Sequence, residues 1–265
     1  MNIGLIIIGD EILSGKRQDK HLPKVIELLA ARGLTLTWAR CVGDDRVRIT
    51  EALTAAFASG DLVFSCGGIG ATPDDHTRQC AAAALGVPLE LHPDAKALIV
   101  DRMRDVAAEQ GLPFEPERAD NLHRLNMGMF PAGAAIIPNP YNKIPGFTVG
   151  DVHFVPGFPV MAWPMIETVL DRPRYAPLRG KPPAVERSVI VFGAMEAALT
   201  PLMEDIEARH EGVKVFSLPS VDHPQWGRHI ELGVKGEAAA VAAAYLALRN
   251  GLLAAGADLG PELVR

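Results

Sequence analysis

The sequence has few cysteines and no cluster of basic residues, and both shortages exclude classes of protein. Its three cysteines, Cys41, Cys66 and Cys80, are an odd number and form no CxxC pair. That excludes a disulfide framework or a zinc knot and is typical of reduced, cytosolic thiols. The net charge is -6 and the basic residues are scattered, whereas a nucleic-acid surface needs clustered cations to neutralise phosphates. We therefore expect no nucleic-acid partner.

Long hydrophobic runs are also missing. The apolar run at residues 3–8 is too short for a membrane span, and it lacks the basic start of a signal peptide. It is typical instead of a strand that is covered on both faces. We expect a cytoplasmic protein with no membrane partner.

What the sequence does contain is a repeated alternation of strand and helix patterns. Strands are expected at residues 3–8, 34–42 and 61–66, and a helix follows each of them. Such alternation is typical of a parallel sheet with right-handed crossovers. It predicts an α/β protein with a three-layer α/β/α domain and a mostly parallel sheet over residues 1–172. Within it, residues 93–129 are expected to be helical and residues 134–138 and 152–155 to be strands.

The remainder of the chain predicts a second, smaller domain. Residues 171–185 are rich in proline and charge, which favours a linker. A strand, a helix, two strands and a helix are expected over residues 185–250, which together indicate a small α+β domain. Residues 251–265 are expected to be a loosely ordered tail.

Ligands of open parallel sheets bind beyond the carboxyl ends of the strands, so the segments after the strands are the candidate sites. The first strand is followed by GDEILSG at residues 9–15. Gly9 permits a sharp exit from the sheet, and Asp10 and Glu11 place two carboxylates at its rim. The alternative is that Asp10 caps a short helical turn and Glu11 is merely solvated.

The third strand is followed by GGIGATPDDHT at residues 67–77. Its three glycines let successive amide groups point into one concavity, where an anion can bind. A helix start with Thr72 as its N-cap explains the TPDD segment but leaves the glycines unexplained. The loop therefore predicts anion binding, although it lacks the Gly-Lys-Ser/Thr of a Walker loop and the last glycine of a dinucleotide fingerprint.

A third region combines Asn142 with two Pro-Gly pairs that contain Gly146 and Gly157. Both pairs are expected to form type II turns, with glycine at the positive-φ position. His76, His123 and His153 have no metal-ligand spacing and are expected at the surface or at helix caps.

Taken together, the GDEILSG, GGIGATPDDHT and NP…PGF…PGFP segments resemble the molybdopterin-binding domain family. This family includes the MoaB and Mog proteins and the N-terminal part of CinA, and the likeness is closest to short CinA-like proteins. It covers residues 3–170, and the following segment resembles the small domain that comes next in CinA. The amidase domain of longer members lies beyond the likeness, so deamidase activity is not expected.

The resemblance implies a small phosphorylated ligand, a nucleotide or a pterin. CinA-type members resemble ADP-ribose pyrophosphatases that depend on Mg²⁺, Mn²⁺ or Co²⁺, whereas molybdopterin-binding members transfer an adenylyl group to that pterin. A non-catalytic nucleotide sensor is the third possibility, and a homo-oligomer is expected.

On this likeness, the catalytic candidates are Asp10, Glu11, Asp74 and Asp75, of which Asp74 and Asp75 would bind the metal. The ligand-binding candidates are Gly9, Ser14, Gly67, Gly68, Gly70, Thr72, Thr77, Asn142, Gly146 and Gly157. Ala71, Asn142 and Ile144 depart from the residues more usual in the family, so they alter the loops that would meet the organic part of the ligand.

Overall fold

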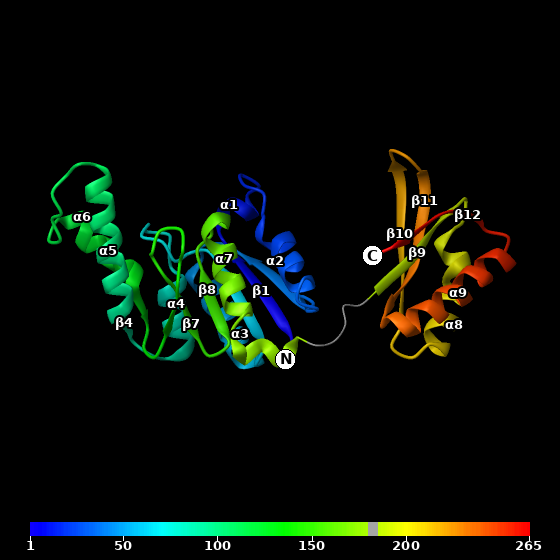
Figure 1. Ribbon diagram of the computed structural model, residues 1–265, viewed down its shortest axis with the longest axis horizontal. Coiled ribbons are helices and arrows are strands. Elements are labelled where there is room, and N and C mark those ends of the chain that lie inside the picture. The colour runs from blue at the N-terminus through cyan, green and yellow to red at the C-terminus, as the bar shows by residue number, and fades with distance from the viewer. Residues whose placement is uncertain (180–184) are drawn as a thin grey trace. The chain divides into compact units, whose positions relative to one another are not determined.

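The computed structural model describes residues 1–179 and 185–265 and divides the chain into two compact units, Met1–Arg179 and Gly180–Arg265 (Figure 1). The division falls within the proline-rich segment at residues 171–185. Residues 180–184 of that segment lie outside the described residues. Each unit has its own hydrophobic core.

The N-terminal unit is built on a six-stranded sheet with the order β2-β1-β3-β8-β7-β6. Four neighbouring strands are parallel, and β7 is antiparallel to both of its neighbours. The mostly parallel sheet predicted from the alternation is therefore confirmed. The strands are β1 (Ile3–Ile8), β2 (Trp38–Val42), β3 (Leu62–Cys66), β6 (Ala135–Ile137), β7 (Gly146–Val149) and β8 (Val152–Val155).

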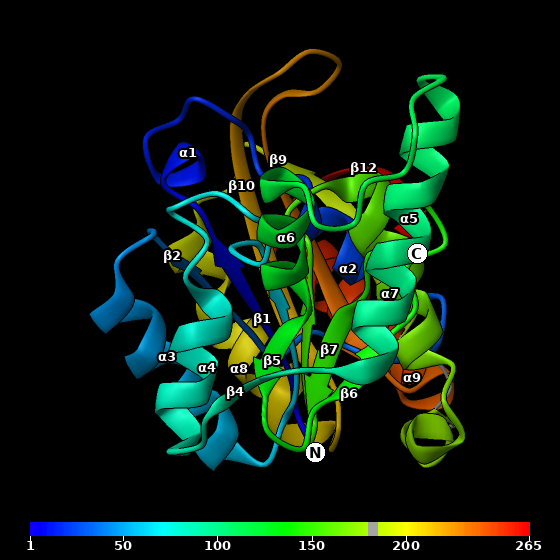
Figure 2. The same ribbon diagram turned by 90° about the vertical axis from the view of Figure 1, so that its left-hand side faces the viewer.

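Helices cover both faces of this sheet, which gives the three expected layers (Figures 1 and 2). Because β1 and β3 are buried on both faces, every residue in them is buried and their sequences are almost wholly apolar. One face packs against α2 (His21–Ala30) and α7 (Pro159–Leu170). The other packs against α3 (Arg46–Ser59), α4 (Thr77–Leu85) and α5 (Pro93–Glu109).

An excursion between β3 and β6 carries α6 and the far end of α5 away from the sheet (Figure 1). Its ends are joined because β4 pairs with β5 in an antiparallel ribbon. The helical pattern expected over residues 93–129 is interrupted after α5, where Gly111 has a φ of 66°. The elements of the excursion after α4 are β4 (Leu89–Leu91), α5, α6 (Ala119–Arg124), the 3-10 turn η1 (Leu125–Gly128) and β5 (Met129–Pro131).

Strand β7 is an element that the sequence did not reveal, because its first residue is Gly146 in a Pro-Gly pair. The type II turn expected there is wrong, since the φ of Gly146 is not positive. A Cβ at this position would lie 2.2 Å from the Phe154 carbonyl oxygen. Glycine is therefore required by the close approach of neighbouring strands and not by a turn.

The C-terminal unit is a four-stranded antiparallel sheet with the order β10-β11-β9-β12. Its two helices pack on the sheet and form a separate core with it (Figure 1). The elements are β9 (Val185–Phe192), α8 (Glu196–Arg209), β10 (Lys214–His223), β11 (Gly227–Gly236), α9 (Ala238–Ala254) and β12 (Asp258–Val264).

The loosely ordered tail expected at residues 251–265 is wrong. Helix α9 continues to Ala254, and β12 pairs with β9 along most of its length. Leu252 is buried in the core, and Arg265 and Glu186 exchange two backbone hydrogen bonds of 3.0 and 2.9 Å. The Gly-Pro pair in β12 disguised this strand, because it coincides with a shift of register. No described helix in either unit is both long and apolar enough to cross a membrane.

Candidate functional site

The carboxyl ends of the parallel strands bring the candidate segments to one edge of the N-terminal sheet. The segments after β1 and β2 are joined by a hydrogen bond from the Gly9 amide to the Val42 carbonyl, 3.0 Å long. Those after β3 and β8 are joined by a bond from the Gly67 amide to the Val155 carbonyl, also 3.0 Å. A Cβ on Gly67 would lie 2.3 Å from the Ile8 carbonyl oxygen. Gly67 is therefore required where the glycine loop crosses the end of β1.

The carbonyl groups of the glycine loop, residues 67–70, all point toward the body of the protein. Thr77 binds the first two, with its hydroxyl 3.0 Å from the Gly67 oxygen and its amide 3.0 Å from the Gly68 oxygen. Arg78 donates from its guanidinium group to the carbonyls of Ile69 and Gly70. The loop is thus held from behind by the first two residues of α4.

Unlike the carbonyl groups, the amide groups that follow Gly67 in this loop have no partner in the described part of the chain. Over residues 1–179 and 185–265, no protein acceptor binds the amides of Gly68, Ile69, Gly70 and Ala71. Gly67 and Gly68 have φ angles of 108° and 68°, which a residue with a side chain adopts only with strain. Successive amides that point outward from such a loop form a concave site for an anion.

The alternative in which Thr72 caps the following helix is wrong, because α4 begins at Thr77 and its N-cap residue is His76. The intervening residues form a tight turn in which the Asp75 carboxylate accepts from the Thr72 amide and hydroxyl, the first bond being 2.8 Å. This carboxylate approaches Gly70 so closely that a Cβ there would lie 2.6 Å from it. Thr77 is fully buried, so it holds the loop in place and does not face a ligand.

Carboxylates gather beside the glycine loop. The Asp10 amide donates to the Asp44 carboxylate over 2.8 Å, and the Asp44 amide donates to the Asp10 carboxylate over 3.1 Å. Burial raises the pKa of Asp44, and the negative charges of Asp10, Asp74 and Glu11 raise it as well, while the bond from the Asp10 amide lowers it. Three carboxylates therefore lie close enough to Asp44 for their charges to act on it.

Asp44 was not among the residues singled out from the sequence, although a signal for it exists. It follows β2 in a Gly-Asp-Asp segment, so the rule that pointed to Asp10 points to it equally. Asp10 itself begins the short helix α1 (Asp10–Leu13) without capping it. Its carboxylate instead binds Asp44, and Ser14 lies exposed just after this helix.

The described residues contain no group of three or more histidine, cysteine or acidic side chains arranged to hold a metal ion. One oxygen of Asp75 is occupied by Thr72, whereas Asp74 is exposed. The assignment of Asp74 and Asp75 as metal ligands stays a prediction.

The third region reaches the same edge but differs from the expectation. Gly157 lies against the glycine loop, where its Cβ would be 3.4 Å from the Gly67 Cα. Its carbonyl oxygen is 3.0 Å from Nε2 of the buried His21, and its φ is not positive, so the expected type II turn is wrong. Gly146 packs inside the sheet, and Asn142 uses its amide to bind Ile144 and Met161.

Of the three histidines, His153 does not lie where it was expected, whereas His123 does. His153 is fully buried in β8, where it contacts the hydroxyls of Thr148 and Tyr175, so its expected place at the surface is wrong. His123 in α6 is exposed and lies 2.9 Å from the Ala71 carbonyl, which ties the excursion to the glycine loop.

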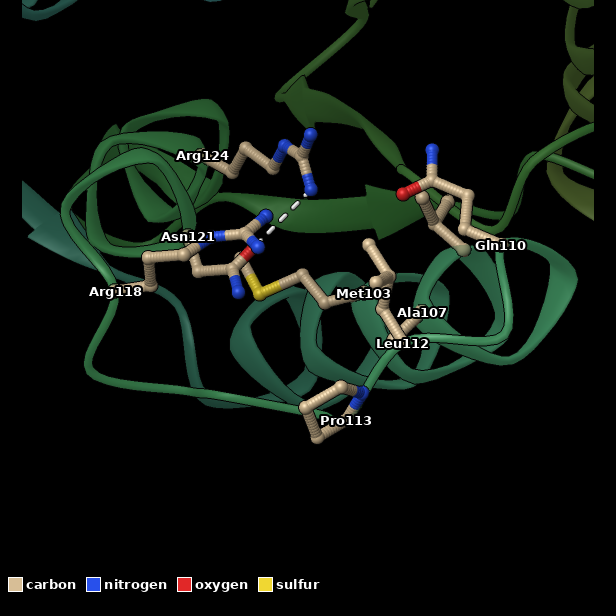
Figure 3. A pocket seen from close by; sticks show the side chains of 9 residues that line it. Met103, Ala107, Gln110, Leu112, Pro113, Arg118, Asn121 and Arg124 are labelled. Carbon is tan, nitrogen blue, oxygen red and sulfur yellow. Dashed lines mark hydrogen bonds between the residues drawn. The ribbon is translucent and has the colours of Figure 1, made fainter.

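A separate pocket lies between α5 and α6 (Figure 3). Its wall combines apolar side chains with Gln110, Arg118, Asn121 and Arg124, and Arg124 donates to the Asn121 side chain over 3.0 Å. None of the residues that line this pocket belongs to the carboxyl edge of the sheet or to the candidate residues.

The fold and its edge loops define a class, namely three-layer α/β proteins with an amide-lined loop at the carboxyl edge of a mostly parallel sheet. The family follows from comparison. Residues 4–176 match the model of a family described as "Probable molybdopterin binding domain", and the chain belongs to this family.

Its relatives include CinA-like proteins. A CinA-like protein of Anaeromyxobacter dehalogenans (strain 2CP-1 / ATCC BAA-258) is 36% identical over 164 residues, which are 60% of this chain and 38% of the relative. One of Anaeromyxobacter sp. (strain K) is 31% identical over 278 residues, covering 100% of this chain and 64% of the relative. The chain thus spans less than two thirds of the length of these relatives.

Among solved structures, CinA of Thermoplasma acidophilum, described as of unknown function, matches with a TM-score of 0.52 and 29% identity, over 63% of this chain and 95% of that one. MoaB of Pyrococcus furiosus, a tungsten cofactor synthesising protein, matches with a TM-score of 0.39 and 22% identity, over 67% and 94%.

Proposed function

We propose that the chain is a CinA-type, metal-dependent pyrophosphatase that hydrolyses a nucleotide sugar such as ADP-ribose. The observation that carries this proposal is the meeting of two opposite charge preferences at one edge of the sheet. The amides of residues 68–71 favour an anion, while Asp10, Glu11, Asp44 and Asp74 favour a cation. A pyrophosphate that binds together with a divalent metal satisfies both.

The amides have the role of binding the non-bridging oxygens of the pyrophosphate. Donors that are already oriented stabilise charge as it develops on those oxygens, and they need no rearrangement during the reaction. Thr77 and Arg78 keep these donors oriented, because they occupy all the carbonyls on the opposite side of the loop.

The carboxylates have the role of receiving the metal. Asp74 and Asp75, with help from Asp10 or Glu11, would hold a Mg²⁺, Mn²⁺ or Co²⁺ ion. Mg²⁺ is commonly bound by one or two carboxylates together with substrate phosphates, so a complete protein cage is not required for the residues to fit. When bound, such an ion neutralises phosphate charge and lowers the pKa of a coordinated water.

The proposed reaction adds one water across the phosphoanhydride. An oxygen–phosphorus bond forms at one phosphorus, the bridging P–O bond breaks, and the products are AMP and ribose 5-phosphate with release of protons. The test is incubation of the full chain with ADP-ribose and each metal, followed by chromatography of the nucleotides. We expect AMP only when a metal is present, and none after the substitution Asp74→Asn. Absence of AMP with all three metals would refute the proposal.

The family description favours a second candidate, molybdopterin binding with adenylyl transfer. The same amides would then bind the pterin phosphate. Tight molybdopterin binding together with intact ADP-ribose would select this function. A nucleotide that binds and survives prolonged incubation would select a sensing role instead.

A further inference from the structure

Arg78 is the one buried cation that backs the glycine loop, among the residues that the structure describes. It stands in the first turn of α4, and only 2% of its surface is exposed. Its two terminal nitrogens donate to the carbonyls of Ile69 and Gly70, and in the described part of the chain its Nε has no partner. Arg78 follows the GGIGATPDDHT segment and is not among the candidate residues taken from the sequence.

The charge of this arginine has no salt-bridge partner within residues 1–179 and 185–265. Burial lowers the pKa of Arg78 to about 10, while the negative charge of Asp75 raises it, so the group remains a cation at neutral pH. A buried charge without a close counter-ion is costly, and a neutral donor would bind two carbonyls at a lower cost. The charge therefore calls for an explanation beyond the folding of the loop.

We infer that Arg78 is a positioning residue for the anion, which both turns the loop amides outward and supplies a positive charge beneath them. The inference rests on the proposed function, because it assumes a phosphate on the outer side of the loop. Arg78 does not touch that phosphate, since the backbone of residues 69 and 70 stands between them. Its charge offsets the repulsion that the neighbouring carboxylates exert on the ligand.

A purely structural role predicts a different outcome, and the two can be separated by ligand charge. If Arg78 only shaped the loop, its replacement would lower the binding affinity of every anion by the same factor. If its charge acts on the ligand, the loss of binding affinity increases with the charge of the anion. Lysine at position 78 then restores part of the lost affinity. Inorganic phosphate and inorganic pyrophosphate are therefore suitable probes, and neither requires turnover.

The experiment is calorimetric titration of the full chain with both anions. The variants are Arg78→Lys, Arg78→Gln and Arg78→Met, with Arg104→Met as the control. Arg104 is an exposed arginine of the same unit that pairs with Asp101, so its loss changes the net charge equally. We expect the glutamine and methionine variants to lose about tenfold or more in pyrophosphate affinity and distinctly less in phosphate affinity. The lysine variant should lie within about threefold of the wild type, and the control should be unchanged.

Equal losses for both anions, or equal losses in the lysine and glutamine variants, would overturn the inference. If the methionine variant fails to fold, the comparison of lysine with glutamine decides. If the proposed function is wrong but the role of Arg78 is right, the experiments give a different result. In that case the wild type leaves ADP-ribose intact while the charge-dependent loss is still seen. Conversely, hydrolysis of ADP-ribose by the glutamine variant with an unchanged KM would leave the function intact and refute the role of Arg78.

Discussion

The environment of the buried His153 predicts that the N-terminal unit loses stability in mild acid. The Tyr175 hydroxyl donates to Asp151 over 2.8 Å, so it accepts from Nε2 of His153, which lies 2.7 Å away. Nδ1 then accepts from the Thr148 hydroxyl at 2.8 Å. The neutral ring satisfies every partner, whereas a protonated ring would place a second N–H against Thr148.

The magnitude follows from the pKa of His153 in the two states. Burial, together with the positive charges of Arg172 and Arg174, lowers this pKa from 6.5 to about 3 in the folded protein. The unfolded chain therefore takes up a proton that the folded one refuses. The contribution of His153 to the free energy of unfolding is fully present above pH 6.5. It falls by about 1.4 kcal/mol per pH unit as the pH drops from 6.5 toward 3. Between pH 7 and pH 5 the loss from this residue is about 2 kcal/mol.

The assay is urea unfolding at pH 7 and pH 5 in a Trp226→Phe background. The remaining tryptophans, Trp38 and Trp163, both lie in the N-terminal unit, so their emission reports its unfolding alone. The substitution His153→Gln removes the titrating group. This substitution should lower the free energy of unfolding at pH 7. It should also make the decrease in that free energy between pH 7 and pH 5 smaller by about 2 kcal/mol. An equal loss between pH 7 and pH 5 with and without His153 would refute the reasoning.

Two further predictions concern the site. Gly68→Ala should abolish pyrophosphate binding in calorimetry, and in urea unfolding it should destabilise the unit more than Gly60→Ala does. Both glycines have a φ of 68°, but only a Cβ on Gly68 would collide with Thr77, at 2.1 Å. Gly60→Ala should cost about 1–2 kcal/mol and leave binding intact, so equal effects of the two would contradict the packing argument. Asp44→Asn should tighten metal-free pyrophosphate binding, since it removes a negative charge, yet lower metal-dependent turnover of ADP-ribose. Unchanged turnover would exclude Asp44 from the metal site.

The arrangement of the site was predictable in outline because it depends on topology. Parallel strands place the segments that follow them at one edge, so the positions of Asp10 and Gly67 in the sequence were enough to predict that they lie together. The alternation of strand and helix predicted a mostly parallel sheet, but the order of its strands comes from the structure alone. In the structure, Gly67 crosses the end of β1, where its Cβ would lie 2.3 Å from the Ile8 carbonyl oxygen, two residues before Asp10.

The roles of individual residues were less predictable, because a residue type does not reveal which way its side chain points. Thr77 has a hydroxyl suited to phosphate, yet the fold uses that hydroxyl for the Gly67 carbonyl. Gly146 was interpreted as a turn residue, but it is required by the approach of the Phe154 backbone. Arg78 is on a helix whose other buried residues are small or polar, and nothing in the local pattern indicates a buried cation.

The two charge preferences at the carboxyl edge constrain the ligand more than either does alone. A simple anion would bind the amides but would be repelled by the carboxylates of Asp10, Glu11, Asp44 and Asp74. A simple cation would be attracted by these carboxylates but repelled by the amide groups. The partial burial of Asp44 and the like charges of its neighbours both raise the pKa of this carboxyl, so a cation at this point would relieve an unfavourable charge. A phosphorylated ligand with its own divalent cation removes the conflict on both sides. The same reasoning explains the buried arginine behind the loop. Its attraction for the anion when the metal is absent offsets the free-energy cost of burying its charge.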